Sequence, residues 1–191
     1  MYKRAYYMVN AITFYRMVAA PLLLLLVINH QLEVFRWLLA VSFFTDAIDG
    51  FLARRYKVSS AFGARLDSIA DDLTIAAGIA GMLVFKSGFI EEHLFIIILL
   101  LILFVVQIGI SFIRYRKMTS FHTYGAKVAA IFQGVFLILL FFLPQPLLFL
   151  FYLTAAVTAI ELVEEIIIVI MLPEWETDVK GLYWVIRRQN R

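Results

Sequence analysis

The sequence has 191 residues, of which 63% are hydrophobic and 16% charged; 18 are phenylalanine, and the net charge is +3. This composition excludes a soluble globular domain, because long apolar runs recur along the whole chain and leave no room for a separate water-facing domain. Because the sequence contains no cysteine, disulfides and thiolate metal sites are excluded as well.

Six apolar runs approach the length of roughly 20 residues that a helix needs to cross a bilayer. In chain order they cover about 10–30, 36–53, 64–86, 93–113, 126–143 and 146–171. The basic and aromatic segment MYKRAYYM predicts a short interfacial helix over about 1–8, and the residues from about 173 to 191 predict an amphipathic tail. We therefore expect an all-α fold: one polytopic membrane domain over residues 1–191, with six transmembrane helices.

The basic residues predict the orientation of these helices in the membrane. They gather at the N-terminus, in the loops that follow the second and fourth runs, and at the C-terminus: Lys3, Arg4, Arg54, Arg55, Lys57, Arg114, Arg116, Lys117, Lys180, Arg187, Arg188 and Arg191. The opposite side has Arg36 and Lys86 beside Glu33, Glu91 and Glu92. The positive-inside rule therefore predicts that both termini and the two basic loops are cytoplasmic. In a bacterium the location would be the inner membrane.

The stretch DAIDGFLARRYKVSSAFGARLDSIADD, residues 46–72, has carboxylates between two apolar runs. On helices, Asp46 and Asp49 share one face near the cytoplasmic end of the second span, and Asp67 and Asp71 share one face at the start of the third. The loop between these spans is short, so we expect antiparallel neighbouring helices whose acidic faces meet. Asp72 lies off that face and is expected to take no part.

Four carboxylates that converge at the edge of a bilayer repel one another and need a positive partner. One interpretation is a solvated ion-pair cluster with Arg54, Arg55, Lys57 and Arg65. The other is a hard divalent cation, Mg²⁺, Mn²⁺ or Ca²⁺, because the available donors are oxygens. Two same-face pairs on adjacent helices favour the cations, and two metal ions would suit a diphosphate substrate.

Eight residues of this stretch have a fixed spacing, Asp46-x2-Asp49-Gly50-x2-Ala53-Arg54-x8-Gly63-x3-Asp67-x3-Asp71. The pattern resembles the motif of the CDP-alcohol phosphotransferase family. The segment NAITFYR, with Asn10, Thr13 and Arg16, followed by Pro21, resembles the first helix of that family. The resemblance implies a homodimeric membrane enzyme that transfers a phosphatidyl group from CDP-diacylglycerol to a small alcohol and releases CMP. The implied partners are these substrates and membrane lipid, with no nucleic acid.

The resemblance also implies roles for the matching residues. One or two divalent ions, Mg²⁺ or Mn²⁺, would be held by Asp46, Asp49, Asp67 and Asp71. Asp71 would also be the base that deprotonates the acceptor hydroxyl. The CDP part of the donor would be bound by Asn10, Gly50, Ala53, Arg54 and Gly63.

The alcohol acceptor has to be predicted from residues beyond the motif. Basic residues are candidates for binding a phosphorylated acceptor: Arg65, Arg114, Arg116, Lys117 and Lys127. The stretch SFHTYGAKVAA resembles the Gly-x-x-Lys stretch of the branch that uses glycerol phosphate, without its second lysine. We expect glycerol 3-phosphate as the acceptor; inositol phosphate, serine and phosphatidylglycerol are the alternatives.

Three further carboxylates, Glu161, Glu164 and Glu165, lie inside the sixth apolar run, where they must face protein or water. They could line the acceptor pocket, pair with Lys127 or Arg16, or support the dimer. In the pocket they would favour a hydroxyl-rich or cationic acceptor. An ion-conducting or transporter-like protein is the alternative from another class. It predicts acidic residues at several depths, whereas the motif aspartates lie at one depth.

Overall fold

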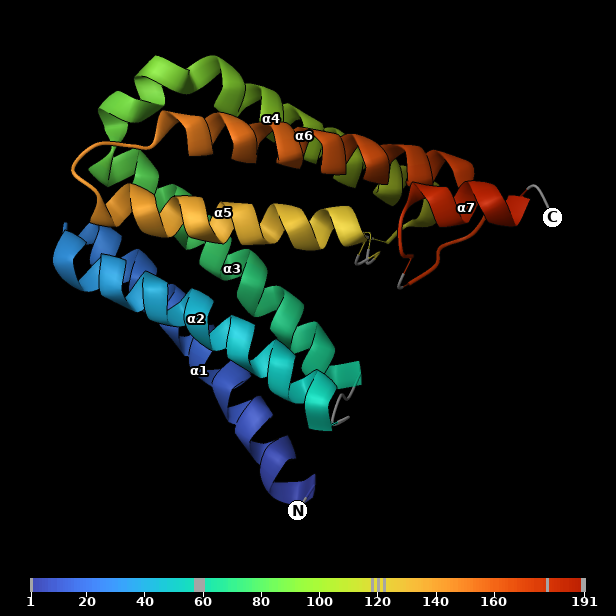
Figure 1. The fold of residues 1–191 in the computed structure, drawn as a ribbon, viewed down its shortest axis with the longest axis horizontal. Coiled ribbons are helices and arrows are strands. Elements are labelled where there is room, and N and C mark those ends of the chain that lie inside the picture. The colour runs from blue at the N-terminus through green and yellow to red at the C-terminus, as the bar shows by residue number, and fades with distance from the viewer. Residues whose placement is uncertain are drawn as a thin grey trace. The chain divides into compact units, whose positions relative to one another are not determined.

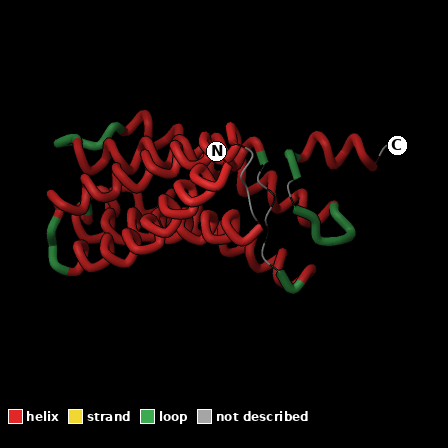
Figure 2. Tube along the Cα trace, turned by 90° about the horizontal axis from the view of Figure 1, so that it is seen from below, coloured by secondary structure: helices red, strands yellow, loops and turns green. Residues whose placement is uncertain are grey.

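The computed structural model describes residues 2–56, 61–117, 119, 121, 123–177 and 179–189. Side chains are described throughout these ranges except at 2–10, 13, 46–47, 49–56, 61–68, 71–72 and 189. The described chain forms seven α-helices and no strand (Figure 1, Figure 2): α1 Tyr2–Ile28, α2 Leu32–Tyr56, α3 Ala61–Phe85, α4 Ser87–Tyr115, α5 Tyr124–Phe142, α6 Leu148–Met171 and α7 Leu182–Gln189. The expected all-α fold class is confirmed for these residues.

The chain divides into two compact units, and the first comprises residues 1–90 and 141–144. In this unit α1 packs against both α2 and α3, which also contact each other. The buried side chains include Ala19, Ala20 and Leu23 on α1 and Phe35 and Leu39 on α2. Alanines in the core of α1 let neighbouring helix backbones approach closely, as is common in membrane helix bundles.

An aromatic cluster joins α2, α3 and the end of α5 within the first unit. The ring of Phe35 lies 5.4 Å from that of Phe85 and 5.0 Å from that of Phe141, measured between centroids. Gly81 of α3 lies so close to the Phe35 ring that an added Cβ would overlap with it. The absence of a side chain at Gly81 therefore permits the observed approach of α2 and α3.

The second unit comprises residues 91–140 and 145–191. Within it, α4 has a non-helical backbone at His93, with φ −117° and ψ 17°. The His93 ring is buried and lies 4.9 Å from the ring of Phe151 on α6. At the other end of α4, the Tyr115 hydroxyl lies 2.8 Å from the carbonyl oxygens of Val169 and Leu172. Contacts near both ends therefore hold α4 against α6.

The observed helices differ from the predicted segments near the N-terminus and between the third and fourth spans. The predicted interfacial helix, about 1–8, and the first predicted span form one continuous helix, α1, which passes through Pro21. The interval between the third and fourth predicted spans is also helical, because α4 begins at Ser87 directly after α3. Its irregular residue is His93. The predicted tail contains the short helix α7.

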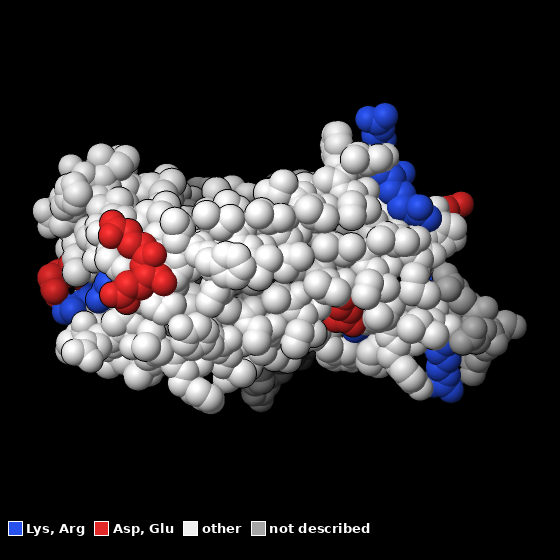
Figure 3. All heavy atoms as spheres, turned by 90° about the horizontal axis from the view of Figure 1, so that it is seen from above, with Lys and Arg blue, Asp and Glu red and all other residues white. Residues whose placement is uncertain are grey.

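Two helices, α4 and α5, are long and apolar enough to cross a membrane among the residues that the structure describes. α6 has 24 residues, but every stretch of 18 residues within it contains Glu161, Glu164 and Glu165. The described apolar parts of α1 and α3, Phe14–Ile28 and Leu73–Phe85, are shorter than a full span. The six-span topology therefore stays a prediction. Much of the surface drawn in Figure 3 consists of uncharged residues.

Candidate functional site

The motif aspartates lie on two helices that contact each other and run in opposite directions (Figure 1). Asp46 lies ten residues before the end of α2 at Tyr56, and Asp71 lies ten residues after α3 begins at Ala61. At the rise of an α-helix, each is about 15 Å from the end where α2 and α3 are connected. Asp49 and Asp67 are both about 10 Å from that end by the same measure. The aspartates thus fall at two matched levels, counted along each helix from that end.

The predicted CDP-binding residues lie on α1, α2 and α3. Gly50, Ala53 and Arg54 belong to the last two turns of α2, Gly63 lies in the first turn of α3, and Asn10 lies on α1. α1 packs against both other helices. All the predicted metal and CDP-binding side chains, and that of Arg65, lie outside the described residues. The roles assigned to these residues therefore stay predictions. The positions of the residues along the helices are compatible with those roles.

Arg16 on α1 is a site candidate that the sequence analysis did not select. Its side chain is 1% exposed, the largest among the fully buried side chains that the structure describes. A guanidinium buried in an apolar helix requires polar or acidic partners, and such groups in predicted membrane segments are commonly functional. The sequence feature that could have indicated Arg16 as a site residue is its place about two helical turns inside the first apolar run.

Two of the candidate acceptor-binding cations have partners in the second unit. Arg114 donates from Nε and Nη2 to the carbonyl oxygen of Leu172, at 3.2 and 3.0 Å, and so holds the C-terminal end of α6. The Lys117 ammonium lies 4.5 Å from the centre of the Trp175 ring. These contacts give both residues a structural role, whatever part they have in binding an acceptor.

Among the described residues, Lys127 and Arg116 lack the polar contacts that Arg114 makes. Lys127 is exposed on the first turn of α5, and its ammonium lies 5.4 Å from the centre of the Tyr124 ring. Arg116, also exposed, has a left-handed backbone with φ 56° directly after α4. Lys127 and Arg116 are therefore acceptor candidates whose charge has no hydrogen-bond or ion-pair partner among the described residues.

The α6 glutamates have different surroundings, although they lie within two helical turns. Glu165 is 8% exposed and accepts a 2.7 Å hydrogen bond from Gln107 Nε2, which also lies 2.6 Å from Thr119 Oγ1. Glu164 Oε1 accepts a 2.8 Å hydrogen bond from the Leu182 backbone N–H. Glu161 has no hydrogen-bond or ion-pair partner among the described residues. Pairing with Lys127, one of the possibilities raised by the sequence, is absent from the described contacts.

A pocket of about 310 Å³ lies between α5 and α6 within the second unit. It is lined by Tyr124, Gly125, Val128, Val157, Ile160, Glu161 and Glu164. A Cβ added at Gly125 would lie 2.7 Å from Glu164 Oε2, so the glycine makes room for the carboxylate. The pocket combines apolar walls with two acidic groups, a lining suited to a small ligand with hydroxyl groups or positive charge.

The chemistry of the four motif aspartates fits a divalent metal site. They supply oxygen donors, which hard cations such as Mg²⁺ and Mn²⁺ prefer. The residues with described side chains include no group of three or more His, Asp or Glu that could hold a metal ion. The motif aspartates lie outside that set, so the donor chemistry and the matched levels on α2 and α3 are what favour this site.

Residues 6–171 match the CDP-alcohol phosphatidyltransferase family. The chain belongs to this family. The match covers α1 through α6 and ends before α7, so membership in the family leaves the C-terminal helix without an explanation. No solved structure matches the chain significantly.

Curated relatives match shorter parts of the chain. A CDP-diacylglycerol–inositol 3-phosphatidyltransferase of Saccharomyces cerevisiae is 38% identical over 66 residues, 35% of this chain and 30% of the yeast protein. A probable phosphatidylglycerophosphate synthase of Mycobacterium tuberculosis is 34% identical over 79 residues, 38% of each chain. An Arabidopsis thaliana CDP-diacylglycerol–glycerol-3-phosphate 3-phosphatidyltransferase is 58% identical over 33 residues, 17% of this chain and 11% of the plant protein. The matches thus span well under half of each relative.

Proposed function

We propose that this chain is a CDP-alcohol phosphatidyltransferase that transfers the phosphatidyl group of CDP-diacylglycerol to a small alcohol and releases CMP. The observation that carries the proposal is the eight-residue motif on α2 and α3, whose aspartates fall at two matched levels of adjacent antiparallel helices. Membership in the family over residues 6–171 supports the same reaction class.

In the proposed reaction an acceptor hydroxyl attacks the phosphatidyl phosphorus of the donor. A new phosphorus–oxygen bond forms, the bond to the CMP oxygen breaks, and Asp71 accepts the hydroxyl proton. Asp46, Asp49, Asp67 and Asp71 would hold two Mg²⁺ or Mn²⁺ ions, which would neutralise charge on the diphosphate and on the leaving CMP. The CDP-binding residues, Asn10, Gly50, Ala53, Arg54 and Gly63, would orient the donor beside Asp71.

The acceptor we propose is glycerol 3-phosphate. The name of the Arabidopsis relative includes this acceptor, and Arg65, Arg114 and Lys127 are each a candidate to bind its phosphate. Inositol or its phosphate is the second candidate, for two reasons. The yeast relative is named for inositol, and the pocket of the second unit has two carboxylates suited to a hydroxyl-rich ligand.

We propose that residues 1–191 act as one membrane domain with six spans, in a homodimer with both termini and the aspartates on the cytoplasmic side. The apolar helices α4 and α5 and the distribution of basic residues support this orientation. Single cysteines at Lys57, Lys117 and Arg191 should react with a membrane-impermeant thiol reagent from the cytoplasmic side. Cysteines at Lys86 and Gln145 should react from the opposite side. Labelling of positions 57 and 86 from one side would contradict six spans.

The reaction is tested by CMP release from CDP-diacylglycerol, with purified protein, Mg²⁺ or Mn²⁺ and a panel of alcohols. Glycerol 3-phosphate should support the highest turnover, and EDTA should abolish it. Full turnover in EDTA would contradict the metal site, and ion flux across proteoliposomes without CMP release would favour the transporter alternative. Asp46→Asn should abolish turnover while the protein still folds, because removing one carboxylate relieves repulsion in the metal-free state.

The roles of Asp71 and Asp49 are separated by measuring binding and chemistry independently. Asp71→Asn should leave binding of the CDP-lipid nearly intact and lower single-turnover CMP release by about 10²-fold or more. Asp49→Asn should weaken binding of the CDP-lipid, because its metal would bridge to the diphosphate. Asp72→Asn is the matched control and should change neither. Equal loss of binding in Asp71→Asn and Asp49→Asn would show that Asp71 is an ordinary metal ligand.

A further inference from the structure

The helix α7, Leu182–Gln189, is docked on one side and exposed on the other. Its docked side contributes Val185, which is 2% exposed, to an apolar cluster with Ile168, Val169 and Leu172 from the end of α6. Its outward side exposes large apolar and aromatic side chains. Tyr183 is 62% exposed and Ile186 is 42% exposed. Burial against α6 therefore explains the apolar residues on the docked side of α7. The apolar residues on its outward side have no described partner that explains them.

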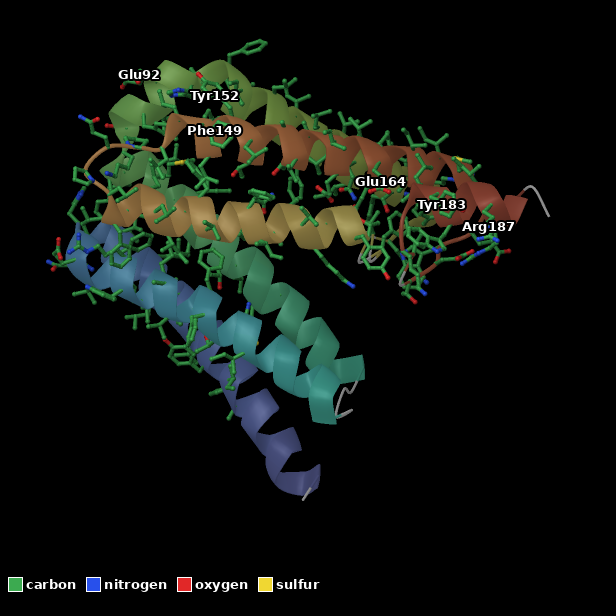
Figure 4. All side chains as sticks on the ribbon, in the orientation of Figure 1. Glu92, Phe149, Tyr152, Glu164, Tyr183 and Arg187 are labelled. Carbon is green, nitrogen blue, oxygen red and sulfur yellow. The ribbon has the colours of Figure 1, made fainter. Side chains whose placement is uncertain are left out.

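Hydrogen bonds fix which side of α7 faces outward. The N–H of Leu182, its first residue, donates to Glu164 Oε1 on α6 at 2.8 Å. Just before α7, the Lys180 carbonyl accepts a 3.1 Å hydrogen bond from the Tyr124 N–H at the start of α5. The Tyr124 and Trp184 rings lie 5.4 Å apart. Figure 4 shows Tyr183 and Arg187 on α7, with Glu164 on the neighbouring α6.

The outward face combines aromatic, aliphatic and basic residues at helical spacing. Tyr183 and Arg187 are four residues apart and share a face, and Ile186 lies beside them. Arg187 has no ion-pair partner among the described residues, whereas Arg188 donates to Glu176 at 2.7 Å. Lys180, just before the helix, is also exposed. α7 contains no acidic residue, so the charge that this face contributes is positive.

This combination fits the headgroup region of an anionic bilayer. Tyrosine and tryptophan are enriched where hydrocarbon meets water, and lysine and arginine bind the anionic lipids of the cytoplasmic leaflet. The apolar cluster ties α7 to Ile168 and Val169 in the last turn of α6 and to Leu172 directly after it, where a span that ends at Met171 would leave the hydrocarbon. The side chains are thus at the level where lipid phosphates would lie.

We propose that α7 is an interfacial helix whose face of Tyr183, Ile186 and Arg187 binds anionic phospholipid headgroups beside the end of α6. This inference rests on the proposal that α6 spans the membrane. The family match ends at residue 171, so α7 lies outside the matched residues. The occupant is a lipid surface, because the face has exposed apolar area as well as positive charge.

The cysteine-free sequence allows the depth of single spin labels to be measured in lipid nanodiscs. A label at Ile186→Cys should have the oxygen and nickel accessibility of the headgroup region. It should move deeper when phosphatidylglycerol is mixed into phosphatidylcholine, and high salt should reverse this shift because it screens surface charge. A label at Phe104→Cys, exposed near the middle of α4, is the reference for the hydrocarbon. It should be deep in both lipids.

Two matched charge variants test the face. Arg187→Gln should remove most of the shift caused by phosphatidylglycerol, whereas Arg188→Gln, which loses the same charge from an existing ion pair, should retain most of it. Equal loss in both variants would overturn the assigned face. A water-exposed label at position 186 with a deep label at position 104 would overturn the inference and leave the membrane topology intact. Exchange broadening at position 186 in detergent, which needs contact between the labels of two copies, would show that a second copy of the chain covers this face instead of lipid and would also overturn the inference.

Discussion

Replacement of Glu164 by alanine is expected to loosen the start of α7 without unfolding the bundle. Glu164 Oε1 is the acceptor for the Leu182 N–H, and Glu164→Ala removes it. A partly buried donor left without its acceptor costs about 1–3 kcal/mol. If α7 opens locally, this raises the population of the open form roughly 5- to 150-fold, since 1.4 kcal/mol corresponds to about a factor of ten.

Hydrogen exchange measured by mass spectrometry reports this opening directly. Amides of α7 should exchange roughly 5- to 150-fold faster in Glu164→Ala, whereas amides in the middle of α5 should keep their protection. Glu164→Gln is the matched control, because its side-chain oxygen can still accept the N–H. A neutral acceptor is weaker than a charged one by about 1 kcal/mol, so acceleration by Gln should stay below about tenfold.

Unchanged protection of α7 in Glu164→Ala would refute this reasoning, because it would mean that the apolar cluster alone holds the helix. Equal acceleration in α5 and α7 would refute it as well, since the effect would then be global unfolding. CMP release should be measured in the same variants, because Glu164 also lines the pocket between α5 and α6. A change in the KM for the acceptor with unchanged turnover at saturation would connect that pocket to acceptor binding.

Two further predictions concern helix packing. Gly81→Ala should lower the unfolding temperature, because its Cβ would displace the Phe35 ring at a cost of about 1–3 kcal/mol, whereas Gly88→Ala, with open space at its Cβ, should not. Gln107→Leu should destabilise the protein by about 1–3 kcal/mol, because the buried Glu165 carboxylate loses its amide donor. The double variant Gln107→Leu with Glu165→Leu should recover part of the loss; a double variant less stable than Gln107→Leu alone would contradict the proposed pairing.

Helical periodicity and hydropathy were sufficient to predict the fold class, because the apolar runs are long and few other structures satisfy their backbone groups in lipid. The same pattern could not predict the break of α4 at His93. Residues on both sides of His93 favour a helix, and its ring is held by a tertiary contact with Phe151. The pattern also could not predict that the interfacial segment and the first span form one helix, α1. A change from polar to apolar residues changes the surroundings of a helix but does not end the helix.

The candidate site was predicted at the level of spacing, because carboxylates at i, i+3 and i, i+4 share a helix face whatever lies around them. Partners distant in sequence were not predictable in this way. Glu161 and Glu165 share a face by their spacing, yet Glu165 accepts a hydrogen bond from Gln107 while Glu161 lines a pocket. The position of a residue along a helix gives the direction of its side chain. The partner of that side chain depends on which neighbouring helix lies in that direction.

The different surroundings of the three α6 glutamates have a physical reason. A carboxylate within an apolar helix is tolerated when it can accept hydrogen bonds from donors or from water, and each of the three glutamates has a different environment. Gln107 meets Glu165, the Leu182 N–H meets Glu164, and Glu161 lies at the pocket without a donor among the described residues. Two of the carboxylates are therefore explained by packing of α4 and α7 against α6. Glu161 is the carboxylate that contacts among the described residues do not explain, and the pocket that it lines is where a ligand of the second unit could meet it.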